Sequence, residues 1–142
     1  MGTDMHCIIE ALNKKTGKWD CFGVSTANRY YRMFSRIADV RNSESEETYI
    51  EPIDGPRGWP ADVSDPAESW SKYYDLPFSQ TWLNRAELEA LNRWECEDNE
   101  KGNLWEFLGF GHLSYFFSLE GSWAKAAFVK YSDLRVLFFF DN

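Results

Sequence analysis

Three kinds of segment are missing from this sequence, and each absence removes a class of protein. No run of about 18 apolar residues occurs, so a membrane-spanning helix is not predicted. Residues 1–6 lack a basic stretch followed by an apolar one, so no secretory signal is predicted. The three cysteines follow no repeated spacing, which argues against a disulfide framework and a zinc finger. We therefore expect an intracellular protein that is not secreted.

Signatures of common enzyme and metal sites are also missing. There is no Gly-x-x-x-x-Gly-Lys-Ser phosphate loop, no Gly-x-Gly-x-x-Gly dinucleotide fingerprint and no Gly-x-Ser-x-Gly nucleophile elbow. With two histidines and no Cys-x-x-Cys, a zinc site has few ligands to draw on. We predict neither a metal nor a cofactor, and we leave open whether the protein is an enzyme.

Apolar side chains and negative charge are what the sequence has in quantity. The 142 residues are 44% hydrophobic and 18% aromatic, with seven tryptophans, which fits one folded domain over residues 1–142. The formal net charge is −8. This charge opposes direct binding to DNA, RNA or an anionic membrane, because their phosphates repel it.

The negative charge is concentrated in the middle of the chain. Residues 1–41 have seven basic and four acidic residues, a net charge of +3, whereas residues 42–106 have five basic and 16 acidic residues, a net charge of −11. Two interpretations stay open. The acidic residues are a solvated surface that keeps the protein in solution, or they form one face that binds a basic partner.

Three segments are predicted to be β-strands. Residues 5–12 and 18–24 stand on either side of a turn at residues 13–17, which predicts a hairpin. Residues 134–140 are rich in aromatic side chains, and both faces are apolar at residues 137–140. That pattern is typical of a central strand covered on each side.

Three helices are predicted as well. Apolar residues recur at helical spacing over residues 30–37, which predicts a helix that ends near Val40. A proline at the start predicts a short helix over residues 67–75. An Asn-Arg-Ala-Glu capping box at residues 84–87 predicts a helix over about residues 85–94. Residues 104–117 fit helix and strand equally.

Residues 42–66 contain four of the five prolines. Because proline is disfavoured inside helices and in sheet centres, this stretch is predicted to be a long loop. It also contains large apolar side chains that a solvated linker does not need, so we expect it to lie across the core. The predicted fold is α+β, with a mixed or antiparallel sheet built from the hairpin and the C-terminal strand, packed helices, and the proline-rich loop over one edge.

Two kinds of side chain are candidates for chemistry. Asp4 and His6 lie two residues apart on one side of a predicted strand, where they form either an acid/base pair or a structural hydrogen bond. Arg57 stands between a proline and a glycine, and this setting suits bidentate binding of a carboxylate or phosphate, from a ligand or from the chain itself. Three arginines on one helix face either bind phosphate or pair within the chain: Arg29, Arg32 and Arg36.

Acidic and aromatic side chains are candidates for binding a protein partner. Tryptophan is enriched at interfaces, and carboxylates steer a basic partner toward its binding surface. The alternative is that the aromatic side chains pack beneath the long loop. The residues expected to contact a partner are Glu44, Glu46, Glu47, Glu51, Trp59, Trp70, Glu95, Glu97 and Asp98.

Four short stretches occur in one order over nearly the whole chain. They are Met-Gly-Thr-Asp-Met-His at residues 1–6, Ala-Asp-Val-Arg-Asn at 38–42, Pro-Arg-Gly-Trp-Pro-Ala-Asp-Val-Ser at 56–64 and Arg-Val-Leu-Phe-Phe-Phe-Asp-Asn at 135–142. Together they resemble a family of small, mostly uncharacterised proteins encoded by tailed phages and prophages. The resemblance implies action inside a bacterial host and names no activity. The polar positions that match the pattern either line one pocket or fasten the loop: Asp4, His6, Arg41, Asn42, Arg57 and Asp62.

Two functions follow as hypotheses. The first is a non-enzymatic binding protein in the host cytoplasm, which inhibits a defence factor or a nucleic-acid-handling protein by occupying its basic surface. The alternative is a small protein that binds or processes a nucleotide-like ligand. In that case Arg41, Asn42, Arg57 and Asp62 hold the ligand, and Asp4 and His6 are the acid/base pair.

Overall fold

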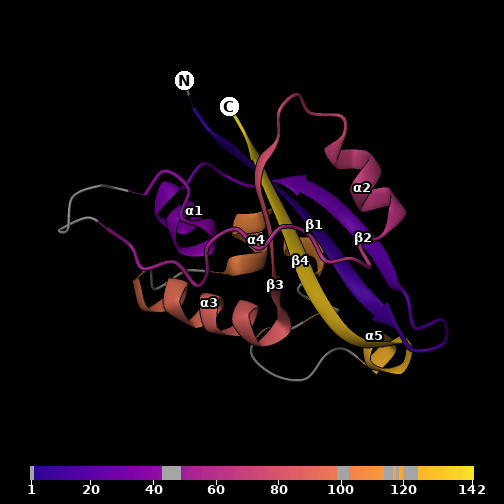
Figure 1. The fold of residues 1–142 in the computed structure, drawn as a ribbon. Helices are drawn as coiled ribbons and strands as arrows, with labels where there is room; N and C mark the ends of the chain where they lie inside the picture. The colour runs from indigo at the N-terminus through magenta and orange to yellow at the C-terminus, as the bar shows by residue number, and fades with distance from the viewer. Residues whose placement is uncertain (1, 43–48, 99–102, 114–116, 118, 120–124) are drawn as a thin grey trace.

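The computed structural model describes residues 2–42, 49–98, 103–113, 117, 119 and 125–142 (Figure 1). Within these residues four strands form one antiparallel sheet in the order β2-β1-β4-β3. The strands are β1 (Asp4–Asn13), β2 (Trp19–Thr26), β3 (Phe78–Asn84) and β4 (Tyr131–Asp141). The fold is α+β as predicted, with β1 and β4 in the centre of the sheet.

The hairpin of β1 and β2 forms where the sequence predicts it. Gly17 has a φ of 69°, in the left-handed region that glycine tolerates, and its N–H donates to the carbonyl of Asn13 at 2.9 Å. The register shifts between Ile9 and Glu10, which places one extra residue in β2 as a β-bulge.

β4 is the predicted central strand, and β3 is an addition that the sequence did not indicate. The residues of β4 from Leu137 to Phe140 are fully buried. In β3 a run of polar residues follows Phe78, Ser79 has a φ of 53°, and the register shifts before Thr81. The strand is therefore defined by its pairing with β4 and not by a polarity pattern of its own.

The predicted helices form with small changes of length. They are α1 (Tyr31–Ala38), α2 (Asp65–Ser71) and α3 (Arg85–Asp98). The capping box begins α3 as expected, because Glu87 N–H donates to Asn84 Oδ1 at 2.9 Å and Asn84 N–H donates to Glu87 Oε1 at 3.1 Å. Helices α4 (Leu104–Leu108) and α5 (Lys125–Lys130) and the 3₁₀ turn η1 (Gly111–Leu113) complete the described elements. None of the described helices has the length and apolar character to cross a membrane.

The sheet separates two apolar cores. On one face, side chains such as Met5 and Phe138 pack with residues of α1, α3 and α4. On the other face, Ile8 and Phe139 pack with Ala67 of α2 and with surrounding aromatic side chains. Figure 1 shows α2 set apart from α1, α3 and α4. Alternate residues of β1 and β4 therefore enter different cores, which explains why both faces of these strands are apolar.

The proline-rich segment is fastened to the sheet by hydrogen bonds. Gly58 N–H donates to the carbonyl of Gln80 at 2.8 Å, along the outer edge of β3. Trp59 Nε1 donates to the carbonyl of Phe138 at 3.3 Å. These bonds place residues 57–59 beside β3, where they cover the edge that β3 would otherwise present to solvent.

Truncating a ring in either core should cost a similar free energy. Phe138 and Phe139 are both fully buried, in different cores. We expect Phe138→Ala and Phe139→Ala each to lower the free energy of unfolding by about 3–5 kcal/mol in urea denaturation. Tyr73→Ala is the control, because Tyr73 is 86% exposed. A negligible effect of Phe139→Ala would contradict the existence of the second core.

Candidate functional site: a groove beside β2 and the surface of α2

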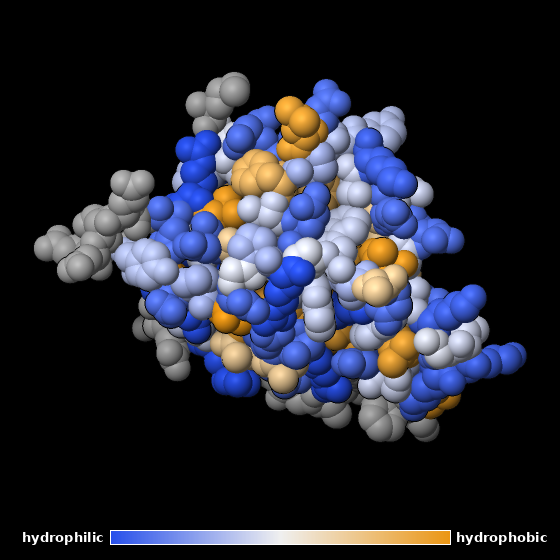
Figure 2. Space-filling model, viewed as in Figure 1, coloured by the Kyte–Doolittle hydropathy of each residue, from blue (hydrophilic) through white to orange (hydrophobic). Residues whose placement is uncertain are grey.

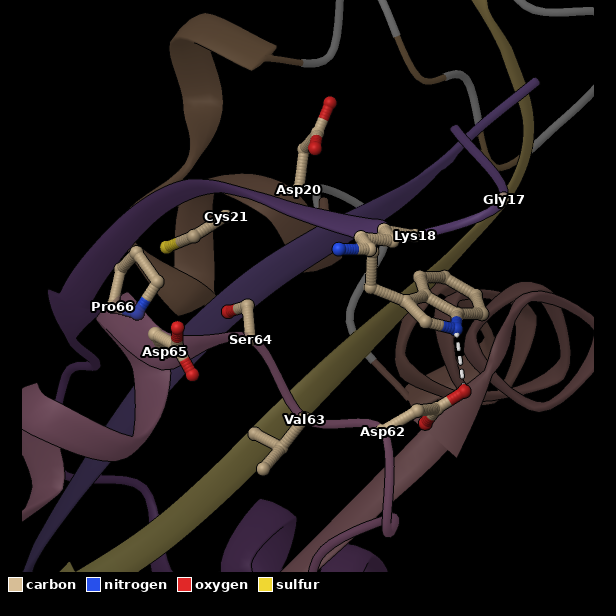
Figure 3. Close-up of a pocket in the computed structure, with 10 residues that line it drawn as sticks. Gly17, Lys18, Asp20, Cys21, Asp62, Val63, Ser64, Asp65 and Pro66 are labelled. Atoms are coloured by element: carbon tan, nitrogen blue, oxygen red, sulfur yellow. Dashed lines mark hydrogen bonds between the residues drawn. The ribbon is translucent and has the colours of Figure 1, made fainter. Parts of the chain in front are cut away.

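A groove of about 680 Å³ opens between the start of β2 and the segment that leads into α2 (Figure 3). Residues 17–21 form one wall and residues 62–66 form the other. Cys21 points toward Pro66 across the groove, whereas Asp20 points away from it (Figure 3). The two neighbours differ because successive side chains of a strand lie on opposite faces.

An ion-pair network lies beneath the groove. Glu10 is fully buried and Arg135 is 4% exposed, and Arg135 Nε lies 2.7 Å from Glu10 Oε1. The other oxygen of Glu10 accepts a hydrogen bond from Ser64 N–H at 2.8 Å. Arg135 Nη1 donates to Asp62 Oδ1 at 2.9 Å, and its guanidinium stacks 3.9 Å from the centre of the Trp19 ring. A buried carboxylate is stable only when it is paired, so this network fastens the groove's second wall to β1 and β4.

The side chains of the groove favour binding over covalent chemistry. Asp62 and Asp65 are exposed, and the Arg135 guanidinium holds the pKa of the Asp62 carboxyl below its usual range. Burial raises the pKa of the Cys21 thiol, which keeps it protonated and a poor nucleophile. In the described part of the chain no group of three or more histidine, cysteine or acidic side chains could hold a metal ion.

The Arg57 guanidinium binds other groups of the same chain. Its Nη1 and Nη2 donate to the two carboxylate oxygens of Glu87 at 2.7 and 2.5 Å, and its Nε donates to Asp54 Oδ2 at 3.0 Å. Nη1 also donates to the carbonyl of Trp82 at 2.9 Å. Of the two roles open for Arg57, the structure shows the internal bridge, which joins the proline-rich segment to the start of α3.

Asp4 and His6 lie on the same face of β1 but bind different partners. Asp4 accepts a hydrogen bond from Arg29 Nε at 2.7 Å, which holds the pKa of the Asp4 carboxyl below its usual range. His6 is 3% exposed, and its ring nitrogens lie 2.8 Å from Thr26 Oγ1 and 2.5 Å from Asp141 Oδ1. Thr26 and Asp141 were not predicted, because they reach His6 through strand pairing with residues distant in the sequence.

Arg41 and Asn42 contact neighbouring parts of the chain. Arg41 Nε donates to Thr3 Oγ1 at 2.8 Å, and its guanidinium lies 5.4 Å from the centre of the Tyr31 ring. The Asn42 side chain donates to the carbonyl of Ile50 at 2.6 Å and accepts from Ile50 N–H at 3.0 Å. Asn42 therefore holds Ile50 beside the end of α1.

The six polar positions do not form one pocket. Asp4 and His6 belong to β1, while Arg57 lies against β3, on the far side of β4. Two strand spacings separate β1 from β3, a distance of about 10 Å. Asp62 is held separately by Arg135. The predicted arginine stripe also faces the chain, since Arg29 pairs with Asp4 and two members lie over the Trp94 ring: Arg32 at 4.7 Å and Arg36 at 5.4 Å.

The residues predicted to bind a partner differ in their exposure and in their contacts. Glu51 is exposed. Trp59 and Trp70 are half-buried, and their ring centres lie 6.0 and 5.4 Å from that of Phe139, so both support the second core. Three of the acids lie outside the described residues: Glu44, Glu46 and Glu47. The backbones of three others belong to α3, but their side chains lie outside the described part: Glu95, Glu97 and Asp98.

The connection from α2 to β3 presents apolar side chains to solvent. Tyr73 is 86% exposed and Leu76 is 90% exposed. Leu76 has a φ of 49°, a conformation that residues with a Cβ atom rarely adopt. Figure 2 shows hydrophobic side chains at the top of the molecule, where this connection lies in Figure 1. The sequence did not indicate this surface, because the predicted helix included Tyr73, whereas α2 ends at Ser71.

Comparison with known proteins gave no relative for this chain. No protein-family model, no curated protein and no solved structure matches it. The groove, and the charge and exposure of the surface around it, are therefore the features that bear on function.

Removing Arg135 should be among the most damaging single changes in the protein. Arg135→Ala leaves the fully buried Glu10 carboxylate without its cation, and we expect the free energy of unfolding to fall by about 3–5 kcal/mol. Arg29→Ala is the control, because the pair of Arg29 with Asp4 is exposed to solvent. Urea denaturation measures both. The interpretation is wrong if the two losses are equal.

Stability should decline in acid through the carboxylates that arginines hold. Hydrogen bonds from Arg57 lower the pKa of Glu87, from its usual 4.5, and of Asp54. A carboxyl with a lowered pKa contributes stability above its unfolded pKa, and this stability is lost as the pH falls through the folded value. We expect the free energy of unfolding to decrease below pH 4.5, and less steeply in Arg57→Met than in the exposed control Arg93→Met. Equal slopes for the two variants would contradict the role of Arg57.

Proposed function

We propose that this protein is a non-enzymatic binding protein that occupies a basic surface of a partner protein. The acidic surface of α2 and the neighbouring groove make the contact, and exposed apolar side chains beside the acids anchor it. In the setting that the phage resemblance implies, the partner is a host defence factor or a nucleic-acid-handling protein, and binding inhibits it.

The observation that carries this proposal is the imbalance of exposed charge in the described part of the acidic middle segment. Over residues 49–94, six carboxylates are exposed: Glu51, Asp54, Asp62, Asp65, Glu68 and Asp75. The exposed basic residues in the same range are Lys72 and Arg93. Lys72 is itself paired with Glu68 at 3.6 Å. A negative surface therefore remains after the internal ion pairs are counted.

The placement of these acids supports a protein partner. Asp65 and Asp75 have no ion-pair partner among the described residues, and they stand at either end of the stretch that includes α2 and Tyr73. Exposed aromatic and aliphatic side chains anchor interfaces through burial, while surrounding charges guide the encounter. Leu76, held in a disfavoured backbone conformation and 90% exposed, fits such an anchor.

The class of partner follows from the same charge. Proteins that bind nucleic acid have basic surfaces that match the spacing of phosphates. A rigid display of carboxylates competes for such a surface. The polar side chains that a nucleotide site would need are bound within the chain, which favours this role over the nucleotide-binding alternative.

A salt-dependent capture experiment tests the proposal. The intact protein is immobilised, bacterial host lysate is passed over it at about 0.05 M and about 0.5 M NaCl, and the bound proteins are identified by mass spectrometry. We expect a discrete nucleic-acid-handling protein that is retained at low salt and released at high salt. The double variant Asp65→Asn/Asp75→Asn should lose it, and Glu106→Gln, which removes an exposed carboxylate from α4, should retain it. Retention that is independent of salt and of both variants would refute the proposal.

A further inference from the structure

The two edges of the sheet, β3 and β2, differ in whether another segment of the described chain covers them. The outer edge of β3 is covered, because Gly58 N–H donates to the carbonyl of Gln80 and Arg57 N–H donates to Thr81 Oγ1 at 3.2 Å. β2 has a single neighbour in the sheet, β1. Natural proteins cover or charge their sheet edges to prevent unwanted pairing, so an open edge beside a groove requires an explanation.

The hydrogen bonds of the hairpin identify which backbone groups of β2 face outward. Ala27 N–H donates to the carbonyl of Met5, and Asn13 N–H donates to the carbonyl of Lys18. In an antiparallel pair the hydrogen-bonded positions alternate with positions whose N–H and C=O point away from the partner. Counting from each end of the register as far as the bulge gives the outward positions, which are Val24 and Thr26 on one side of it and Trp19 and Cys21 on the other. In the part of the chain that the structure describes, no backbone group pairs with these outward groups.

Exposure supports an accessible edge at Val24, which is 43% exposed although it is an apolar residue of a strand. Thr26 is exposed as well, but the connection after α4 packs beside it, where Ser25 Oγ donates to the carbonyl of Leu108. At the other end of the edge, Trp19 and Cys21 border the groove. The backbone groups available for pairing and the cavity available for a side chain therefore lie along one line.

We propose that β2 receives an extended, basic segment of the partner as a fifth strand. This inference rests on the proposed function and names the element that is recognised. Backbone hydrogen bonds to the outward groups of β2 provide the attachment, and alternate side chains of the added strand point toward the groove. There the exposed carboxylate of Asp65, which has no ion-pair partner among the described residues, favours lysine or arginine, and Lys18 is the single basic residue of the lining.

The β-bulge limits the length of the added strand. It interrupts the ladder between Cys21 and Gly23, so regular pairing is available on each side of it but not across it. We therefore expect a short recognition segment with basic and β-branched residues in alternation. A second copy of this chain, paired edge to edge through β2, is the competing occupant, and both copies would then bring the same negative charge.

The probe is an acetylated and amidated octapeptide of alternating lysine and valine, titrated into the ¹⁵N-labelled intact protein. We expect amide shift changes at Trp19, Cys21, Val24 and Thr26 and at the Trp19 indole, weaker at high salt. The matched peptide has N-methyl groups on alternate residues, so its charge is unchanged but one edge lacks donors. It should bind about tenfold more weakly, as loss of one to two hydrogen bonds predicts.

A variant of the protein gives the reciprocal test. Val24→Pro removes a donor that points away from β1, at a position where an edge strand tolerates proline, and Val24→Thr keeps the donor. We expect Val24→Pro to bind the peptide about tenfold more weakly than Val24→Thr. If Val24→Pro does not fold, the difference in affinity between the octapeptide and its N-methylated match tests the proposal.

Several outcomes would overturn the inference. They are equal affinity of the two peptides, shift changes confined to other faces, or β2 shifts that depend on protein concentration without peptide, which indicate pairing between copies. Failure here is distinguishable from failure of the proposed function. A host protein captured in a salt-dependent manner equally by Val24→Pro and Val24→Thr would leave the acidic binding role intact and remove the strand-addition mode.

Discussion

The arrangement of the second face depends on one buried ion pair, between Glu10 of β1 and Arg135 of β4. The two residues are cross-strand neighbours in the centre of the sheet, and both are removed from water. An unpaired charge in such a place is costly, so neighbouring groups bind the remaining donors and acceptors of the pair. Asp62 and the backbone of Ser64 do so, and this fixes where the proline-rich segment ends and where α2 begins.

The same constraint accounts for the partners of three polar side chains. Arg57, Arg135 and His6 each have carboxylate partners within the chain, and those partners attach loops and strand ends to the sheet. Side chains committed in this way hold the structure together. Among the described residues, what is left to act outward is the surplus of carboxylates, the exposed connection after α2, and the edge of β2.

The elements that could be predicted from the sequence are those whose signal is local. The hairpin turn, the capping box at residues 84–87 and the doubly apolar strand at residues 137–140 depend on neighbours in the sequence, and each forms as expected. β3 could not be predicted, because it exists through pairing with β4 and its own residues show no alternation. The candidate site shows the same division. Arg57 was predicted as a bidentate arginine, but Glu87 as its partner, and Asp141 as the partner of His6, follow only from the folded chain.

The position of β4 also has a consequence for how the chain is made. β4 is a central strand, yet it follows every other described element in the sequence, and its pairing joins Asp141 to Asp4. Contacts of such high sequence separation slow folding, because a long loop must close before they form. During synthesis the hairpin leaves the ribosome without the strand that covers its inner edge. Completion of the sheet must therefore wait for β4, and until then β1 lacks one of its two neighbours.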